Sequence, residues 1–235
     1  MDIRIGTSGW NYTEWRGSFY PKDMKPAAML AYYAERFSTV EVNNTFYRMP
    51  TARVVADWAV AVPARFTFVL KAPQRITHFS RLRDVDDPVR FFCDTARLLG
   101  PKLGPLLFQL PPNFKADTGR LADVLALLPP DVRAAFEFRN PTWFTDEVYT
   151  RLAARNAALC IADNDDGATP AVATADWGYL RLRATGYSDV DLRGWLATMH
   201  RIGGRWRDAH VFFKHEDEGT GPALGARLMA LAAAE

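Results

Sequence analysis

A short apolar stretch that ends in charged residues recurs along the chain, at intervals long enough to hold a helix. The copy at residues 134–139 reads Ala-Ala-Phe-Glu-Phe-Arg and is cut off by an Asn-Pro pair. Successive side chains of a strand point to opposite faces, so Ala135, Glu137 and Arg139 share one face while the two phenylalanines share the other. Strands that stay apolar until their carboxyl ends are typical of α/β enzymes, which keep their sites at that end.

Six further stretches have the same form, with a polar side chain at or near the carboxyl end of an apolar run. Their ranges are 39–43, 66–71, 106–109, 158–163, 179–183 and 211–215. Together with a short strand expected near residues 3–10, they predict an α/β fold, a single (β/α)8 TIM-barrel-like domain over residues 1–235. The connection between residues 163 and 179 is short and polar, so we expect a short or missing sixth helix.

The composition agrees with one folded domain that has a large core. Hydrophobic residues make up 49% of the chain and charged residues 24%, which is a usual balance for a globular protein. The net charge of +2 is too small by itself to indicate nucleic acid, so any basic patch must be local. The first residues lead directly into strand-like sequence, and no apolar run reaches membrane-spanning length. We therefore expect a cytoplasmic protein without a membrane partner.

The polar residues near the strand ends are the candidate site. We expect acid–base chemistry from three carboxylates and one amine, because such groups exchange protons with a bound substrate. They are Glu137, Glu41, Lys71 and Asp163. The side chains expected to bind substrate lie at the same strand ends or in the loops that follow. They are Ser8, Trp10, Tyr12, Asn43, His78, Gln109, Arg139, Trp143, Arg181, Arg183 and Lys214.

The alternation of side chains predicts two sets of interior layers, because alternate strands of a barrel contribute to the same layer. One set should hold Lys71, Glu137, Arg139, Arg181 and Arg183, and the other Glu41, Asn43, Gln109 and Asp163. Cations outnumber acids in the first set. The charges could form a mutually paired polar plug, or the surplus cations could await an anionic ligand. In either case a cation should lie within salt-bridge distance of Glu137, because an unpaired buried carboxylate is costly.

Two features have both a structural and a functional interpretation. The loop after the first strand carries Trp10 and Tyr12 among other aromatic residues, and it either stacks on a planar or sugar-like ligand or packs its own rings as a lid. Burial is the commoner fate of aromatic residues, which favours the lid. His78 follows the third strand and is an acid, a base, a metal ligand or a loop anchor.

Several of these stretches, in order, resemble the YecE-like family, also known as domain of unknown function 72. The matching segments are 6–10, 40–43, Lys71 with Thr77 and His78, 108–112, 136–139 with Trp143, and Ala162 with Asp163. The resemblance covers nearly the whole chain and implies a TIM-barrel-like fold, but no established activity and no catalytic residues. The family's last strand is associated with an asparagine-rich ending, whereas this chain has Lys214, His215 and Glu216.

Three functions of different classes fit these residues. The favoured one is an enzyme that acts on a small phosphorylated or carboxylated substrate, with the strand-end lysine and arginines as anchors and Glu137 or Glu41 for proton transfer. Arg183, Lys214 and the glycines at 219 and 221 further predict an anion site in the last two loops. No cofactor is indicated.

The second possible function is a metal-dependent phosphodiesterase or nuclease. Its divalent cations would be held by acidic residues and histidines, namely Glu41, Glu137, Asp163, His78 or His215. No HxH or HExxH pairing occurs in the chain, which weakens this interpretation. The third is a non-catalytic ligand or nucleic-acid binder that uses the aromatic loops as a stacking platform.

Overall fold

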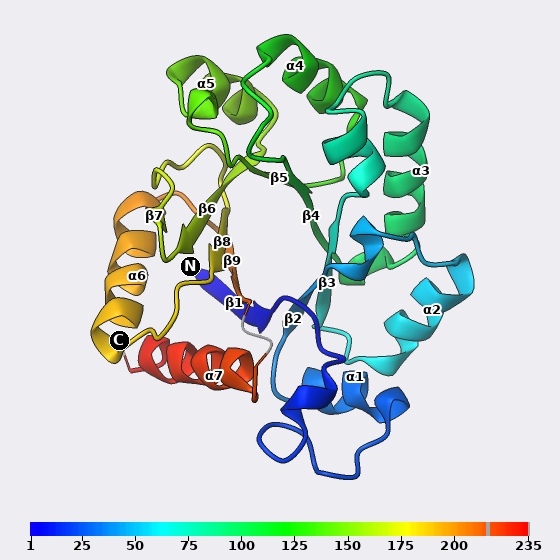
Figure 1. The fold of residues 1–235 in the computed structure, drawn as a ribbon, viewed down its shortest axis with the longest axis vertical. Helices are drawn as coiled ribbons and strands as arrows, with labels where there is room; N and C mark the ends of the chain where they lie inside the picture. Colours follow the sequence, from blue (N-terminus) through cyan, green and yellow to red (C-terminus); the bar gives the residue numbers. More distant parts are fainter. Residues whose placement is uncertain (215–216, 235) are drawn as a thin grey trace.

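The computed structural model describes residues 1–214 and 217–234 and has a nearly closed barrel of parallel strands at its centre (Figure 1). The barrel strands are β1 (Asp2–Thr7), β2 (Thr39–Val42), β3 (Thr67–Lys71), β4 (Leu103–Gln109), β5 (Ala134–Glu137), β6 (Ala158–Asn164), β8 (Gly178–Leu182) and β9 (Asp208–Phe213). They follow one another in the order β1-β9-β8-β6-β5-β4-β3-β2. The fold prediction of a TIM-barrel-like architecture is confirmed.

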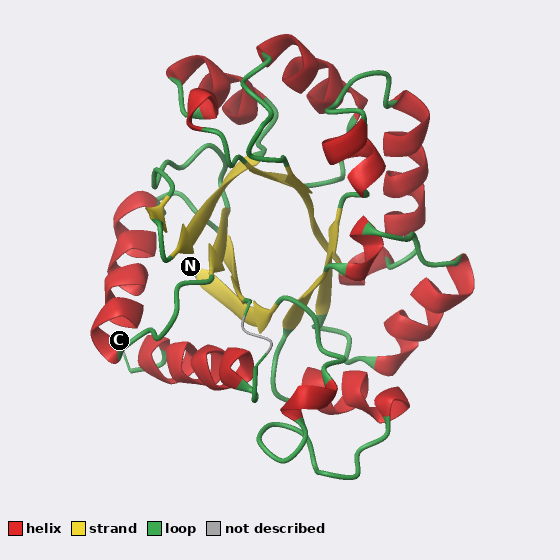
Figure 2. Ribbon diagram, viewed as in Figure 1, coloured by secondary structure: helices red, strands yellow, loops and turns green. Residues whose placement is uncertain are grey.

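Helices form an outer ring around the strands, as Figure 2 shows by colour. They are α1 (Pro26–Ala34), α2 (Ala52–Ala61), α3 (Asp86–Arg97), α4 (Thr118–Leu127), α5 (Asp146–Ala154), α6 (Asp189–Ile202) and α7 (Thr220–Ala232). Side-chain oxygens cap several of them, and at α6 Ser188 and Asp191 form a capping box. None of the described helices is long and apolar enough to cross a membrane.

The helix that would follow the sixth barrel strand, β6, is missing, in agreement with the sequence-based prediction of a short or missing sixth helix. The helix labelled α6 follows the next barrel strand, β8. Residues 165–177, all of them described, hold only the short strand β7 (Gly167–Ala168), which pairs antiparallel with β6. The rest of this segment runs along β6 and is fastened by two threonine hydroxyls. Thr169 Oγ1 accepts from the Ala162 amide, and Thr174 Oγ1 accepts from the Leu159 amide. An extended cover therefore replaces a helix on this side of the barrel.

The first and second strands meet at a seam that has little backbone pairing. A single isolated bridge between Ser8 and Glu41 links them within the described chain. Gly6 permits the close approach, because a Cβ atom at this position would lie 2.2 Å from the Thr39 carbonyl oxygen. From α1, Tyr33 completes the seam: its hydroxyl accepts from the Thr7 amide at 2.8 Å and donates to the Thr39 carbonyl at 3.0 Å.

Large apolar side chains lie between the strands and the helices, whereas the barrel interior is narrow and mixed. Its apolar layer contains small and medium-sized side chains beside three large rings. The members are Val69, Leu107, Ala135, Ala158, Cys160, Trp177, Tyr179 and Phe212. Towards the carboxyl ends of the strands this layer gives way to charged side chains, which build the candidate site.

Candidate functional site at the carboxyl end of the barrel

One buried guanidinium joins the two carboxylates of the barrel interior. Arg181 on β8 donates through Nη2 to Glu41 Oε1 at 2.6 Å and through Nη1 to Glu137 Oε2 at 2.5 Å. All three side chains are at most 2% exposed. Buried ions are tolerated at this depth only when their charges and hydrogen bonds are satisfied by one another. The fork of Arg181 meets this condition for two acids at once.

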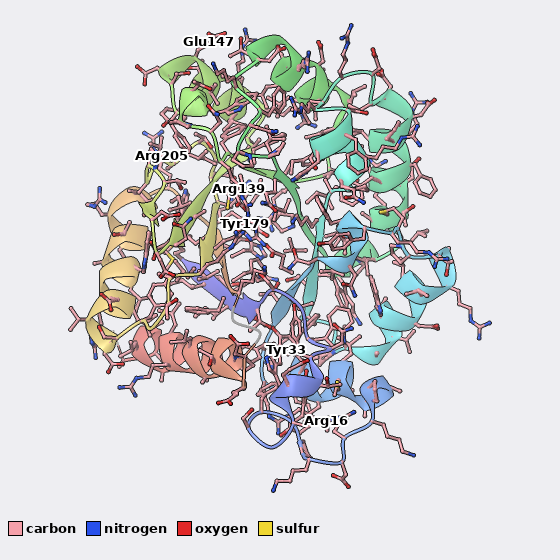
Figure 3. The ribbon with its side chains drawn as sticks, viewed as in Figure 1. Arg16, Tyr33, Arg139, Glu147, Tyr179 and Arg205 are labelled. Carbon is pink, nitrogen blue, oxygen red and sulfur yellow. The ribbon has the colours of Figure 1, made fainter. Side chains whose placement is uncertain are left out.

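Glu41 at the end of β2 is held by four donors. Besides Arg181, its Oε1 accepts from Ser8 Oγ at 2.7 Å and from Asn43 Nδ2 at 3.4 Å. Its Oε2 accepts from the Tyr179 hydroxyl at 2.5 Å. Burial, followed by the charge of Glu41, holds the pKa of Tyr179 well above its usual value, so the phenol stays a donor. Figure 3 shows Tyr179 inside the ring of strands.

Glu137 at the end of β5 is surrounded by three arginines. In addition to Arg181, it accepts from Arg139 Nε at 3.1 Å and from Arg183 Nη2 at 3.1 and 3.3 Å. The prediction that a cation lies within salt-bridge distance of Glu137 is confirmed. Every oxygen of Glu41 and Glu137 already accepts a protein hydrogen bond, which is the arrangement of a structural ion-pair network.

This network joins residues from the two predicted sets of layers. Glu41 and Glu137 belong to different sets by strand alternation, yet both bind Arg181. The long guanidinium side chain reaches across layers, and the small side chains of Ala135 and Cys160 leave room beneath it. Charges from both sets therefore act as one cluster.

Lys71 at the end of β3 differs from the arginines because its ammonium has no hydrogen bond or ion pair within the described parts of the chain, although its backbone carbonyl accepts from Thr45 Oγ1 at 2.7 Å. Its Nζ lies 4.1 Å from the centroid of the Phe46 ring. Burial, followed by the charge of Arg181, lowers the pKa of Lys71 to about 8 against the opposing charges of Glu41 and Glu137. A desolvated amine of this kind is easily deprotonated.

His78 lies beside Lys71 in a short π-helical turn at Arg75–Phe79. Its ring meets Phe46 edge-on with 4.8 Å between centroids, so Lys71 and His78 contact the same phenyl ring. His78 Nδ1 is 2.9 Å from Thr77 Oγ1, which leaves Nε2 as the nitrogen that can exchange a proton with a ligand. Burial, followed by the charge of Lys71, lowers the pKa of His78, so the imidazole is neutral at pH 7.

Other predicted residues complete the same end of the barrel. Gln109 is buried and is in register with Glu137, and Arg139 exposes 38% of its side chain at the mouth. Figure 3 places Arg139 near the centre of the ring. Several buried polar atoms here have no partner among the described residues, namely Arg181 Nε, Arg183 Nε and Asn43 Oδ1.

Two predicted site residues lie on the wrong side of the strands. Asp163 accepts from Tyr187 Oη at 2.6 Å and Trp195 Nε1 at 3.3 Å, and it is in register with Leu182, which packs outside the barrel. Trp143 is fully buried in the outer core, where it stacks on Phe138 at 4.6 Å between centroids. Neither side chain joins the charged cluster.

The aromatic loop packs its own rings, in agreement with the lid interpretation. Within the loop, the Trp15 ring contacts Tyr12 at 4.8 Å and Phe19 at 5.8 Å between centroids. Trp10 packs edge-on against Trp58 of α2 and Phe68 of β3, and the Tyr12 hydroxyl donates to the Ser8 carbonyl at 2.7 Å. Lys214 is exposed. His215 and Glu216, which the sequence associates with a metal site and with the family departure, lie outside the described residues.

Tyr179 and Phe46 are the site residues that the sequence analysis missed. Tyr179 stands two residues before Arg181 and shares its face of the strand, so the alternation contained the signal. Phe46 belongs to a 3-10 turn, Asn44–Phe46, after β2, and no spacing links it to Lys71. Its contact with the lysine depends on the fold of two loops.

A model of the family described as "Protein of unknown function DUF72" matches residues 4–235. The chain belongs to the DUF72 family. Among curated relatives, the UPF0759 protein YecE of Escherichia coli K12 is 32% identical over 60% of the chain, and the match spans about half of YecE. The UPF0759 protein YunF of Bacillus subtilis is 28% identical over 92% of the chain and 79% of its own length.

Solved structures agree with this membership of DUF72. A DUF72 protein from Thermotoga maritima has a TM-score of 0.85 at 24% identity and full coverage of both chains. Another from Enterococcus faecalis has a TM-score of 0.77 at 20% identity, covering 100% of this chain and 98% of its own. D-psicose 3-epimerase from Clostridium cellulolyticum, solved with D-tagatose, has a TM-score of 0.54 at 12% identity over 91% of this chain and 84% of its own, which shows the fold alone.

Proposed function

We propose that this DUF72 protein is an enzyme that binds a small phosphorylated or carboxylated substrate at the carboxyl end of the barrel and transfers protons through Lys71 and His78. The observation that carries the proposal is the unpaired Lys71 beside a network whose acids are fully occupied. Of the described residues in the cluster, two carry negative charge and four carry positive charge. The positive set is Lys71, Arg139, Arg181 and Arg183. An anion would balance this surplus.

The unpartnered donors support a ligand at the same place. Arg181 Nε and Arg183 Nε are buried without an acceptor among the described residues, and a buried donor without a partner is costly. Arg139 is partly exposed and presents a guanidinium, which binds phosphate or carboxylate through two parallel hydrogen bonds. A small oxyanion supplies the acceptors that these groups lack.

We assign proton transfer to the Lys71 amine and the His78 imidazole rather than to the carboxylates. Glu41 and Glu137 are enclosed by donors and serve to position Arg181 and its neighbours. Lys71 and His78 have lowered pKa values and contact one ring, so the two groups are placed to exchange a proton with each other and with a ligand. This assignment revises the sequence-based expectation that Glu137 or Glu41 is the base.

The competing functions have less support. In the described residues no group of three or more His, Cys, Asp or Glu side chains could hold a metal ion, and a guanidinium stands between the two central carboxylates. Trp143 is buried in the outer core and offers no free stacking face, and Trp10 packs in edge contacts with Trp58 and Phe68.

The test is a titration of Lys71 by NMR with lysine labelled at the ε-carbon, since the chain has only six lysines. We expect one resonance, absent in Lys71→Met, to titrate near pH 8, and phosphate to raise that midpoint. Lys115→Met, which removes an exposed lysine far along the sequence, is the matched control and should leave the titration unchanged. A midpoint unaffected by millimolar phosphate at low salt, in wild type and control alike, would refute the anion site.

A further inference from the structure

We propose that Lys71 forms a Schiff base with a carbonyl carbon of its anionic substrate, so that the barrel performs covalent amine catalysis. The inference rests on the proposed function, because the cationic cluster supplies the binding of the substrate's anionic group. It assigns the substrate class as a phosphorylated or carboxylated aldehyde or ketone. The nucleophile, the proton carrier and the anion anchors all come from described residues.

Comparison of two lysines within the chain shows why Lys71 is exceptional. The ammonium of Lys102 is partly buried and donates to the Val62 carbonyl at 2.6 Å and also to the Ala59 carbonyl. A structural lysine is held in this way by acceptors. Lys71 is also partly buried, yet within the described chain its ammonium has no acceptor and contacts only the face of Phe46. Its Nζ is therefore available for bond formation.

Desolvation also makes Lys71 a stronger nucleophile at neutral pH. With its pKa lowered to about 8, about a tenth of the Lys71 side chains are neutral at pH 7, against roughly 1 in 3,000 for an ordinary lysine. Schiff-base lysines of enzymes are activated by an apolar pocket or by neighbouring cations. Phe46 provides the first of these influences, and Arg181 and Arg139 provide the second.

The covalent step balances without an oxidant or reductant. His78 Nε2 takes a proton from the Lys71 ammonium, and the neutral Nζ attacks the carbonyl carbon; a C–N bond forms, the C=O π bond breaks, and a proton passes from the nitrogen to the oxygen to give a carbinolamine. The His78 imidazolium then returns its proton to the carbinolamine hydroxyl, the C–O bond breaks, and water leaves behind a protonated imine. The imidazole, neutral again, accepts a proton from the carbon next to the imine, where the cationic nitrogen draws off electrons.

The anchors fix which carbonyl compounds can react. Arg139 Nε already binds Glu137, so its terminal nitrogens remain for a phosphate or carboxylate at the mouth. Arg183 Nε is a further donor for the same anionic group, because it is buried without an acceptor among the described residues. A carbonyl compound without an anionic group loses these contacts. If the anion site exists, Lys71 should therefore react faster with anionic than with neutral aldehydes, whereas an ordinary surface lysine should not distinguish them.

The experiment is borohydride trapping on the full chain with two matched aldehydes, pyridoxal 5′-phosphate and 5′-deoxypyridoxal, neither of which can close to a hemiacetal. Reduction fixes the imine as a stable amine and blocks trypsin at Lys71, so the adduct is found on the peptide of residues 66–75. We expect the phosphorylated probe to label Lys71 in strong preference to the other five lysines and to react at least about tenfold faster than the neutral aldehyde. The rate should rise with pH and level off above about 8.

Variants separate the roles of the residues. Lys71→Arg should remove the adduct while phosphate still binds, and Arg139→Gln should bring the two aldehydes to similar rates. His78→Gln should slow imine formation without weakening the binding of phosphate. Labelling spread evenly over the lysines would refute the Schiff base. If phosphate still shifts the Lys71 resonance in that case, the anion site stands and only the covalent step falls; if it does not, both fall.

Discussion

At the scale of single residues, the barrel mouth contains ionisable side chains of two kinds. Arg181, Glu41 and Glu137 are saturated by one another, so each depends on the others to stay charged in the interior. Lys71 and His78 have lowered pKa values and few contacts. The first kind fixes geometry and the second can change protonation state, which is the division of labour that a site needs.

Replacement of Glu137 by Gln tests whether this carboxylate is structural. Three arginines would lose their counter-charge, and breaking a buried ion pair costs about 3–5 kcal/mol of unfolding free energy. Chemical denaturation of wild type and variant measures the difference. Glu147→Gln, which breaks an exposed pair with Arg151, is the control and should change stability much less. Unchanged stability in Glu137→Gln would contradict the structural role of the carboxylate and favour the earlier expectation that Glu137 is catalytic.

Replacement of Lys71 by Met should stabilise the protein at neutral pH. The pKa of Lys71 falls from 10.5 to about 8 on folding, so the charged form is less stable in the folded state than in the unfolded state. Below pH 8 the variant should gain up to about 3 kcal/mol of unfolding free energy.

The gain should shrink as pH rises from about 8 to 10.5, because the unfolded chain then holds a proton that the folded wild type has lost, and wild-type stability rises with pH. The measurement is the difference in unfolding free energy between the two proteins across this window. A variant less stable than wild type at pH 7 would show that Lys71 is held by favourable contacts.

At the scale of elements, the strand ends carry polar residues on both faces, and the two faces serve different purposes. Interior residues such as Glu137 build the charged cluster, whereas Asp163 on the outer face of β6 binds Tyr187 and Trp195 beside α6. Phe138 and Trp143 likewise fasten the turn after β5 to the outer core. At a strand end, the inward-facing side chains therefore contribute to the site, and the outward-facing side chains hold the following loop in place.

Asp163→Ala tests this distinction. The substitution removes the carboxylate that accepts from Tyr187 and Trp195, and we expect a loss of about 1–3 kcal/mol of unfolding free energy. Denaturation curves and the phosphate titration of Lys71 measure the two effects separately. The titration should be unchanged, since Asp163 lies outside the barrel. Weaker phosphate binding at unaltered stability would place Asp163 back in the site.

The period-two pattern predicted the strands and their polar ends but could not assign the inner face of β6, because both of its faces are apolar. Side-chain size contains the missing signal. Ala158 and Cys160 face the narrow interior, where Tyr179 fills the space, whereas Leu159 and Ile161 face the helices. The ion pairs were less accessible to prediction. Arg181 meets Glu41 across a sequence separation of 140 residues, and only the closed barrel brings them together.

At the scale of the whole molecule, the ring of strands is least regular between β1 and β2. Strand β1 pairs along its whole length with β9, from Asp2 with Asp208 to Thr7 with Phe213 (Figure 1). It meets β2 through the Ser8–Glu41 bridge and the Tyr33 hydroxyl. The same Glu41 is part of the charged cluster. Closure of the ring and assembly of the site are therefore one structural event.

The pairing of β1 with β9 has a consequence for synthesis on the ribosome. A growing chain exposes β1 early but cannot pair it along this ladder until β9 has emerged, and such long-range closure is slow. Until then Arg181 and Glu41 have no barrel around them, and the Lys71 amine stays in water with ordinary reactivity. The pKa of Lys71 thus falls only when the ring is complete, and an unfinished chain carries an ordinary lysine at this position.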